Sequence, residues 1–352
     1  MARSGSKQPL VSICIPVYNE QKYIADTLEC VKKQTYRNIE VLVLDNCSTD
    51  ETPEICRKFT RDRRFRLMRN RANIGQVHNF NRCYGMASGD FVALLSGNDL
   101  VTPDYIETLL EPMLREPEVG LSYAKCRFID EDSNPIRSLK EDAYFTTDVD
   151  DPVNAATVVM ARFFFTAAIF GLYRRGLIER LQPFRHTYGS DAIFVCEASL
   201  YASIRHGDEE LFSARQHGQI KDLVNLHSED WVRRQPADSS FQKFEQLTPY
   251  IDLLWGHLDM IGRAQIGEKD KGKLCQRACV IFRGRFGKYM DVERDQIFDG
   301  YARNEKVLAG KASDIRYVLL RLNFLEKVKR AVVALPDDER LRDLAKALVS
   351  MT

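Results

Sequence analysis

The sequence has almost no net charge and no long apolar run. Its 51 basic and 50 acidic residues leave a formal net charge of +1, so no overall electrostatic field recruits a nucleic acid. The most apolar stretch, residues 162–173, is shorter than the roughly 18 residues that a membrane-spanning helix needs. These two absences argue against a nucleic-acid partner and against a membrane span.

Secretory and disulfide signals are missing as well. Residues 1–9 contain no apolar core of the kind that signal peptides carry, and we expect this segment to be disordered. The nine cysteines are odd in number and several lie in apolar strand-like runs, which is typical of reduced cytosolic thiols. Cys275 and Cys279 have no second ligand pair nearby, so zinc is not expected. A cytoplasmic protein is the default expectation.

What the sequence does contain is an alternation of apolar runs and amphipathic segments. Strands are expected over 10–16, 39–44, 65–68 and 91–95, and helices over 21–34, from about 49 and over 75–87. This alternation with short loops predicts right-handed βαβ units and a mainly parallel, α/β sheet flanked by helices on both faces. Ligands bind such sheets outside the carboxyl ends of the strands, where the polar residues concentrate here.

Beyond residue 100 the pattern is mixed and then helical. We expect a helix over 103–114, a strand over 119–129, a helix over 191–204 with Ser190 as its N-cap, and a short strand over 210–214. From about residue 235 to the end, the pattern is helical throughout.

Two strand–loop segments carry a family resemblance. They read Val11-Ser-Ile-Cys-Ile-Pro-Val-Tyr-Asn-Glu20 and Val41-Leu-Val-Leu-Asp-Asn-Cys-Ser-Thr-Asp-Glu-Thr52, and Gln34-Thr-Tyr-Arg-Asn-Ile-Glu40 leads into the second. Together they resemble family 2 glycosyltransferases of the GT-A fold, whose members typically read SIIIPTYNE and DDGSTDGT at these places. A combined match over about 45 residues is far more specific than a lone glycine motif.

The resemblance implies an architecture. Residues 10–230 would form a GT-A domain with a Rossmann-like sheet, divided into a nucleotide-binding half, 10–104, and an acceptor half, 105–230. Residues 235–352 would form a helical C-terminal region. Within that region, Ile315–Arg330 is amphipathic with a basic bias. It is open whether the segment packs on the domain, pairs with another subunit or rests on an anionic membrane face.

The first two loops would bind the nucleotide. The resemblance implies contacts from Pro16, Tyr18 and Glu20, and a hydrogen bond from the N3–H of a uracil-like base to Asp45. The alternative for Asp45 is a turn or helix-capping carboxylate. The family usually has a second Asp where this chain has Asn46, so that contact is altered.

A third loop resembles the family segment N-x-G-x-x-x-A-x-N. Here Asn73 and Gly75 precede a helix whose free N–H groups would point toward the strand ends. Asn79 follows one turn later and is assigned to the nucleotide site with them. Arg71 would contact the base or a phosphate, and a solvated surface charge is the equal alternative.

The fourth strand ends in Leu94-Leu-Ser-Gly-Asn-Asp99, where the family reads L-D-A-D-D. Ser96 and Asn98 replace two carboxylates, which leaves Asp99 as the acidic residue. Mg²⁺ on a diphosphate often uses only one or two protein carboxylates. The resemblance therefore implies Mn²⁺ or Mg²⁺ at Asp99, with Asn98 as a neutral ligand or a ribose contact. A plain turn before the next helix is the alternative.

Two later motifs resemble the catalytic half of the family. Asp191, at the start of a helix, is the candidate general base, since a helix N-terminus stabilises negative charge. Simple dipole complementarity is its alternative, and Glu197 is a rival base expected to face away. Arg215 would neutralise phosphate and His217 would meet the metal, although a loop histidine is most often a surface residue.

These implications predict an inverting glycosyltransferase. It would move a sugar from a nucleoside diphosphate, UDP in the first instance, to a hydroxyl of a glycan or lipid-linked acceptor. The protein would be cytoplasmic, with a homo-oligomer contact or a peripheral membrane contact through the helical region left open. A degenerate, non-catalytic GT-A protein is the alternative that the losses at Ser96 and Asn98 support. A nucleotidyltransferase or a dinucleotide dehydrogenase is disfavoured, because the first strand is followed by no glycine-rich loop.

Overall fold

The computed structural model describes residues 8–162, 167–185, 187, 189–216 and 249–304. The chain divides into two compact units, residues 1–286 and 287–352. The description below concerns the first unit, and the second is described only as the helical continuation of α10 over 287–304. The N-terminal segment expected to be disordered falls largely outside the described residues, as does Ile315–Arg330.

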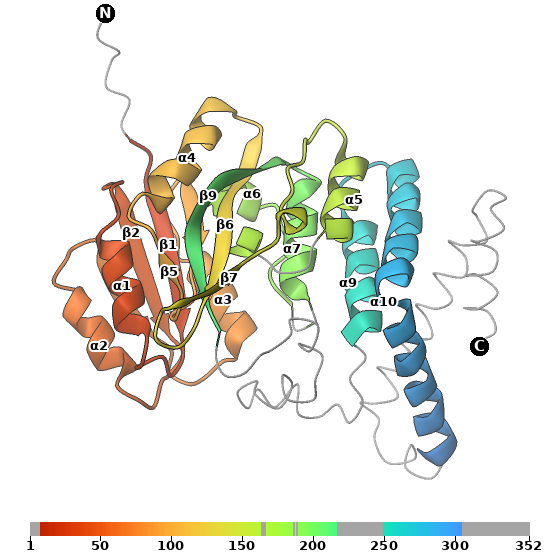
Figure 1. Cartoon of the computed structure of the whole chain (residues 1–352), viewed down its shortest axis with the longest axis horizontal. Helices are drawn as coiled ribbons and strands as arrows, with labels where there is room; N and C mark the ends of the chain where they lie inside the picture. The colour runs from red at the N-terminus through yellow and green to blue at the C-terminus, as the bar shows by residue number, and fades with distance from the viewer. Residues whose placement is uncertain (1–7, 163–166, 186, 188, 217–248, 305–352) are drawn as a thin grey trace, which may run out of the picture. The chain divides into compact units, whose positions relative to one another are not determined.

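A single twisted sheet forms the centre of the first unit (Figure 1). Its strands run in the order β3-β2-β1-β4-β8-β6-β9-β5, and β7 pairs with β6. Their bounds are β1 Val11–Val17, β2 Ile39–Asp45, β3 Phe65–Arg69, β4 Phe91–Leu94, β5 Leu100–Val101, β6 Val119–Ile129, β7 Pro135–Ser138, β8 Leu172–Arg174 and β9 Ser203–Arg215. The expected α/β class with a mixed, mainly parallel sheet is confirmed.

The parallel ladders fix which residues meet at the sheet edge. β1 pairs with β2 from Val11 opposite Ile39 to Val17 opposite Asp45, and every residue of β1 is buried. Such unbroken burial is what a parallel strand covered on both faces requires. β6 and β9 are also parallel, up to Ile129 opposite Arg215. β4 and β6 each pair antiparallel with β8, so they point the same way. The carboxyl ends of β1, β2, β4, β6 and β9 therefore share one edge.

Helices cover the sheet on both faces. The α-helices are α1 Ile24–Lys32, α2 Thr52–Phe59, α3 Gln76–Tyr84, α4 Tyr105–Arg115, α5 Pro152–Arg162, α6 Arg175–Ile178, α7 Ser190–Ser199, α9 Pro249–Arg263 and α10 Glu268–Asn304, with short 3₁₀ turns at Glu141–Ala143 and Ala167–Phe170. α7 packs between α5 and α9 (Figure 1). Only residues 200–202 join α7 to β9, so α7 runs back along the strand and starts at the carboxyl edge of the sheet.

Some local expectations were wrong. The N-cap of α7 is Gly189 in the left-handed region, at φ 66°, and Ser190 is the first helical residue. The last strand of the sheet begins at Ser203, well before the expected residue 210. α5 was not predicted: it contains three valines and one threonine, residue types that favour strands. In the ranges that the structure covers, no helix combines the length and apolarity needed to cross a membrane.

A glycine at the start of β4 tests the packing of the parallel sheet. A Cβ on Gly89 would lie 2.6 Å from the carbonyl oxygen of Leu10 and 2.7 Å from the backbone nitrogen of Ser12. Because backbone atoms cannot give way cheaply, Gly89→Ala is expected to cost about 1–3 kcal/mol of unfolding free energy. Urea denaturation measures it.

Gly85→Ala is the matched control. Gly85 has φ −63°, and an added Cβ meets only ordinary contacts at 3.5 and 3.6 Å. This variant should unfold at the parent's urea midpoint or slightly above it. Equal midpoints for the two variants would contradict the tight approach of Gly89 to β1.

Candidate functional site

The end of β2 holds a carboxylate with no exposed surface. Asp45 is 0% exposed, and its Oδ1 accepts a hydrogen bond from the N–H of Ser48 at 3.0 Å. Its Oδ2 lies 3.3 Å from Nε of Arg69, an ion-pair distance, yet no donor in the described ranges is aligned to hydrogen-bond that oxygen. Oδ1 of Asp45 thus stabilises the turn that follows β2, and Oδ2 is a buried acceptor without an aligned donor. The predicted contact with a base stays a prediction.

An asparagine network holds the third loop against this strand end. Nδ2 of Asn46 donates to Oδ1 of Asn73 at 2.7 Å. Oδ1 of Asn46 accepts from Nδ2 of Asn70 at 2.8 Å and from the N–H of Ile74 at 3.0 Å. A carboxylate at position 46 has no donor for Asn73, so the amide here organises the loop. We had not assigned Asn46 or Asn70 to the site, although the departure of Asn46 from the family pattern was the available signal.

Two predicted nucleotide residues of this loop serve the same scaffold. Asn79 is 3% exposed; its Nδ2 donates to the carbonyl of Leu44 at 3.1 Å, and its Oδ1 accepts from Asn70 at 2.8 Å. Gly75 caps α3 with φ 82°, which only glycine adopts freely, and its N–H donates to Asn73 at 2.9 Å. Arg71 is exposed at the rim of the loop. Nucleotide contacts from these residues remain predictions.

The loop after β1 is tied to the loop after β2. Pro16 is buried in β1, and Tyr18 is half-buried just beyond its end. Asn19, with φ 54°, donates its N–H to Oγ of Ser48 at 2.9 Å, while its Oδ1 accepts from the N–H of Thr49 at 2.9 Å. The two predicted nucleotide loops therefore form one surface. Asn19 and Ser48 were not among the predicted residues.

Two carboxylates meet at the ends of β1 and β4. Burial, reinforced by the charge of Asp99, raises the pKa of Glu20 to about 7. Burial also raises the pKa of Asp99 to about 7, against the stabilising backbone N–H and charge of Arg215. Oδ1 of Asp99 accepts that N–H at 2.8 Å, and the side chain of Asn98 lies half-buried beside it. Glu20 is half-buried and Asp99 is buried, and the charge of Arg215 only partly offsets the effect of burial on their pKa values. A bound cation would stabilise both ionised carboxylates.

Arg215 is enclosed by its own chain. The residue is 7% exposed. Nε donates to the carbonyl of Asn98 at 2.9 Å, and Nη1 donates to the carbonyls of Asp130 at 2.9 Å and Glu131 at 3.1 Å. Both terminal nitrogens lie 3.0 Å from Oγ of Ser133, and the guanidinium stacks 4.5 Å from the Tyr23 ring. Its donors are thus largely committed to protein acceptors, which is a positioning role; the predicted phosphate contact stays untested.

The donor set fits a hard divalent cation in part. Glu20 and Asp99 supply oxygen ligands of the kind that Mg²⁺ and Mn²⁺ prefer, and diphosphate oxygens commonly complete such a shell. Within the described part of the chain, however, no three His, Cys, Asp or Glu side chains come together. His217, the predicted metal ligand, lies outside the described residues.

Asp191 lies at the same edge, in the first turn of α7, and is half-buried. One of its carboxylate oxygens accepts the N–H of Ala192 at 2.9 Å. Glu197, the rival base, is 4% exposed, and burial raises its pKa. It accepts the N–H of Gln182 at 3.2 Å and lines a cavity one turn and a half deeper along α7. The two carboxylates therefore occupy different surroundings.

The chain is similar to proteins of one family. Residues 12–180 match the model of Glycosyl transferase family 2. The glycosyltransferase GlyG of Streptococcus pneumoniae is 35% identical over 103 residues, which cover 29% of this chain and 34% of GlyG. The first curated relatives match over about half of their own length or less, at 48% and 34%.

Solved structures share the fold. The S. aureus protein TarS, residues 1–349, in complex with UDP-GlcNAc superposes with a TM-score of 0.61 at 16% identity, covering 98% of this chain and 88% of that one. The mannosyltransferase PcManGT from Pyrobaculum calidifontis, in complex with GDP-Man and Mn²⁺, gives a TM-score of 0.54 at 16% identity, with 98% and 86% covered. At these identities the likeness concerns the fold.

Replacing Arg215 separates positioning from phosphate binding. Arg215→Lys keeps the charge but loses the planar fork that reaches Asn98, Asp130 and Ser133. We expect a loss of about 2–4 kcal/mol of unfolding free energy, since several charge-assisted hydrogen bonds disappear and carbonyls stay buried. Thermal and urea unfolding measure it. Arg71→Lys, at an exposed position, is the control and should unfold like the parent. Unchanged stability of Arg215→Lys with weakened UDP binding would instead favour the phosphate role.

The raised pKa values of Glu20 and Asp99 predict that the free energy of unfolding depends on pH. Because Glu20 and Asp99 hold protons up to about pH 7 when folded but only to about pH 4 when unfolded, the folded chain carries more protons in that window. Their contribution to stability is complete below about pH 4 and is lost as pH rises through 7, by about 1.4 kcal/mol per pH unit for each proton.

Urea unfolding of the metal-free protein in EDTA at pH 5, 6, 7 and 8 tests this. The Asp99→Asn variant cannot release the second proton, so its stability should fall less steeply with pH than that of the parent. Parallel curves for parent and variant would show that Asp99 is already ionised at pH 5.

Proposed function

We propose, since this chain belongs to glycosyl transferase family 2 through residues 12–180, that it transfers a sugar from a nucleoside diphosphate donor to a hydroxyl group with inversion. The observation that carries the proposal is a pair of carboxylates, the half-buried Glu20 and the buried Asp99, at the edge where four loops converge. Their raised pKa values mark a place that favours added positive charge. A cation carrying a diphosphate suits that place.

The donor would lie across the ends of β1 and β2. The buried Oδ2 of Asp45 is an acceptor without an aligned donor, and leaving such an atom unsatisfied costs about 1–3 kcal/mol. A uracil N3–H would satisfy it once the loops admit the base. TarS, a structural neighbour, is in complex with UDP-GlcNAc, which supports UDP as the first nucleotide to test. Pro16, Tyr18, Arg71 and Asn73 would line the rest of this surface.

A divalent cation would be held by Asp99 and Glu20, with Asn98 and His217 as further candidates. When bound, it would neutralise the charge that develops on the departing diphosphate. Mn²⁺ accompanies GDP-Man in the PcManGT structure. Arg215 would fix Asp99 and Asn98 from behind through its backbone N–H and Nε. In this arrangement Arg215 positions the oxygen ligands of the cation, and its own donors are used by the protein.

Asp191 would act as the general base. It takes the proton of the acceptor hydroxyl while that oxygen forms a bond to the anomeric carbon. The bond from the anomeric carbon to the diphosphate oxygen breaks, and its electron pair leaves with the nucleoside diphosphate. Attack opposite the leaving group inverts the configuration. The start of α7 at the carboxyl edge of the sheet supports this role, because it brings Asp191 to the side where the donor would lie.

A binding protein is the second candidate. Ser96 and Asn98 reduce the strand end to one carboxylate, and a chain that binds nucleotide or glycan in an assembly would tolerate that loss. The acceptor would be a glycan or a lipid-linked glycan in the enzymatic case. Residues 235–352 would provide a subunit contact or a peripheral contact with the membrane's cytoplasmic face.

Asp191→Asn tests the enzyme directly. With a panel of UDP-sugars and other nucleotide-sugars, in the presence and absence of Mn²⁺, the parent should release nucleoside diphosphate. Loss of the base should lower kcat by about 10²–10⁴-fold with UDP affinity unchanged.

Asp208→Asn is the matched control, because the side chain of Asp208 is 92% exposed; this variant should retain parental kcat. UDP binding by the parent without turnover of any donor would favour the binding protein. Full activity of Asp191→Asn would remove Asp191 from the mechanism.

A further inference from the structure

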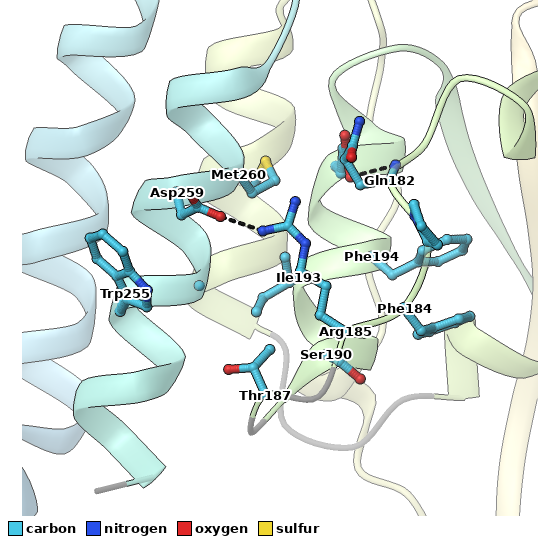
Figure 2. A pocket seen from close by; sticks show the side chains of 13 residues that line it. Gln182, Phe184, Arg185, Thr187, Ser190, Ile193, Phe194, Trp255, Asp259 and Met260 are labelled. Carbon is cyan, nitrogen blue, oxygen red and sulfur yellow. Dashed lines mark hydrogen bonds and ion pairs between the residues drawn. The ribbon is translucent and has the colours of Figure 1, made fainter. Parts of the chain in front are cut away.

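A cavity of about 140 Å³ lies between α7, α9 and the segment that precedes α7 (Figure 2). One wall is a single face of α7, formed by Ser190, Ile193, Phe194 and Glu197. The first and last of these positions are seven residues apart, a rise of about 10 Å at roughly 1.5 Å per residue. The wall starts at Ser190, in the turn that carries Asp191, although Asp191 itself is not among the lining residues.

The opposite wall is formed by α9; like α7 and the other lining residues, it lies beyond residues 12–180, which the family model matches. Trp255 and Asp259, one helical turn apart on α9, are among the residues that line the cavity (Figure 2). α9 approaches α7 closely because Gly256 has no side chain; a Cβ there would lie 2.2 Å from Cδ1 of Ile193. The glycine therefore sets the width of the cavity between the two helices.

The charged groups of the cavity balance one another. Arg185 reaches across from the preceding segment and pairs with Asp259 (Figure 2). Asp259 also pairs with Arg263 on the same helix. Glu197 lies deeper in the wall, and the charges of Arg185 and Arg263 act on it. The two guanidinium groups and the two carboxyl groups balance in formal charge. The cavity therefore offers no excess charge of either sign that would attract an ionic ligand. A neutral ligand with several hydroxyl groups fits this arrangement.

Size and surface narrow the ligand further. An engineered apolar cavity of about 150 Å³ binds benzene, so the present cavity has room for one six-membered ring and not for two. Trp255, Phe194 and Phe184 offer apolar surface, and Thr187, Ser190 and the Arg185–Asp259 pair offer hydrogen-bonding groups around it. A pyranose likewise combines apolar and polar surface, because C–H groups lie on its faces and hydroxyl groups lie around its rim.

We infer that this cavity binds one neutral pyranose ring of the acceptor glycan, with Trp255 as its apolar platform and Arg185 and Asp259 as partners of its hydroxyls. The inference rests on the proposed function, which supplies the acceptor. It assigns acceptor recognition to α9, and it places the bound ring against Ser190, in the helical turn of α7 that carries Asp191.

Free monosaccharides test the site through tryptophan fluorescence. The chain has two tryptophans, Trp231 and Trp255, so a Trp231→Phe background leaves Trp255 as the reporter. Glucose, galactose, mannose and N-acetylglucosamine are titrated, with glucuronate as the anionic comparison. At least one neutral sugar should change the emission saturably in the millimolar range, and saturation-transfer NMR should show its ring protons in contact with the protein.

Variants then locate the binding. Trp255→Ala, read by NMR, should weaken sugar binding by about tenfold or more, and Trp255→Phe should retain most of it because an aromatic face remains. Asp259→Asn should weaken binding with the tryptophan intact. UDP affinity should be parental in all three, and thermal unfolding checks that each variant is folded. Leu114→Ala, which removes a 58% exposed side chain outside the cavity, is the control.

The outcomes separate the two proposals. UDP binding without any monosaccharide effect at Trp255 overturns the cavity inference and leaves the proposed function standing. Sugar binding that depends on Trp255 without any UDP binding supports the cavity as a sugar site and contradicts the proposed function. Glucuronate binding tighter than every neutral sugar, or sugar binding unaffected by Trp255→Ala and Asp259→Asn, overturns the assignment.

Discussion

The buried guanidinium of Arg215 is the interaction on which the rest of the site depends. It joins three segments that are far apart in sequence: the end of β4 at Asn98, the β6–β7 turn at Asp130 and Glu131, and α1 at Tyr23. Its backbone N–H also orients Asp99. Because an arginine with protein acceptors on its fork is held rigidly, the carboxylate that would meet a cation is placed before any ligand arrives.

Near Arg215, two carboxyl groups have surroundings that disfavour their ionised forms. Asp99 is buried and Glu20 is half-buried, and their charges act on each other. The guanidinium of Arg215, whose charge acts on both carboxyls, is hydrogen-bonded to carbonyl oxygens. Strained electrostatics of this kind is common at functional sites. The asparagines at positions 46, 70, 73 and 79 use neutral hydrogen bonds to position the adjoining loop, so they add no charge that would relieve the carboxylates. The edge is thus shaped for a ligand that brings positive charge with it.

Much of this could be predicted from local sequence. The alternation of apolar runs indicated the parallel half of the sheet, and the resemblance located Glu20, Asp45, Asp99 and Asp191 at its edge. The enclosure of Arg215 could not be predicted, because the hydrogen-bond partners of its side chain lie 82 to 117 residues away and are mostly backbone carbonyls. The cavity depends on Gly256 and Trp255 of α9, whose contact with α7 leaves no periodic signal. α5 was missed because tertiary packing overrode the strand preference of its three valines.

The most direct test of the account is calorimetric titration of UDP into the protein at pH 6.5, with and without Mn²⁺, in buffers of different ionisation enthalpy. The account predicts that Mn²⁺ tightens UDP binding by about tenfold or more. It also predicts net release of protons in the presence of Mn²⁺, as the carboxyls of Glu20 and Asp99 ionise, and a smaller release from Asp99→Asn. UDP binding that is indifferent to Mn²⁺ and releases no protons, or no binding at all, would contradict it.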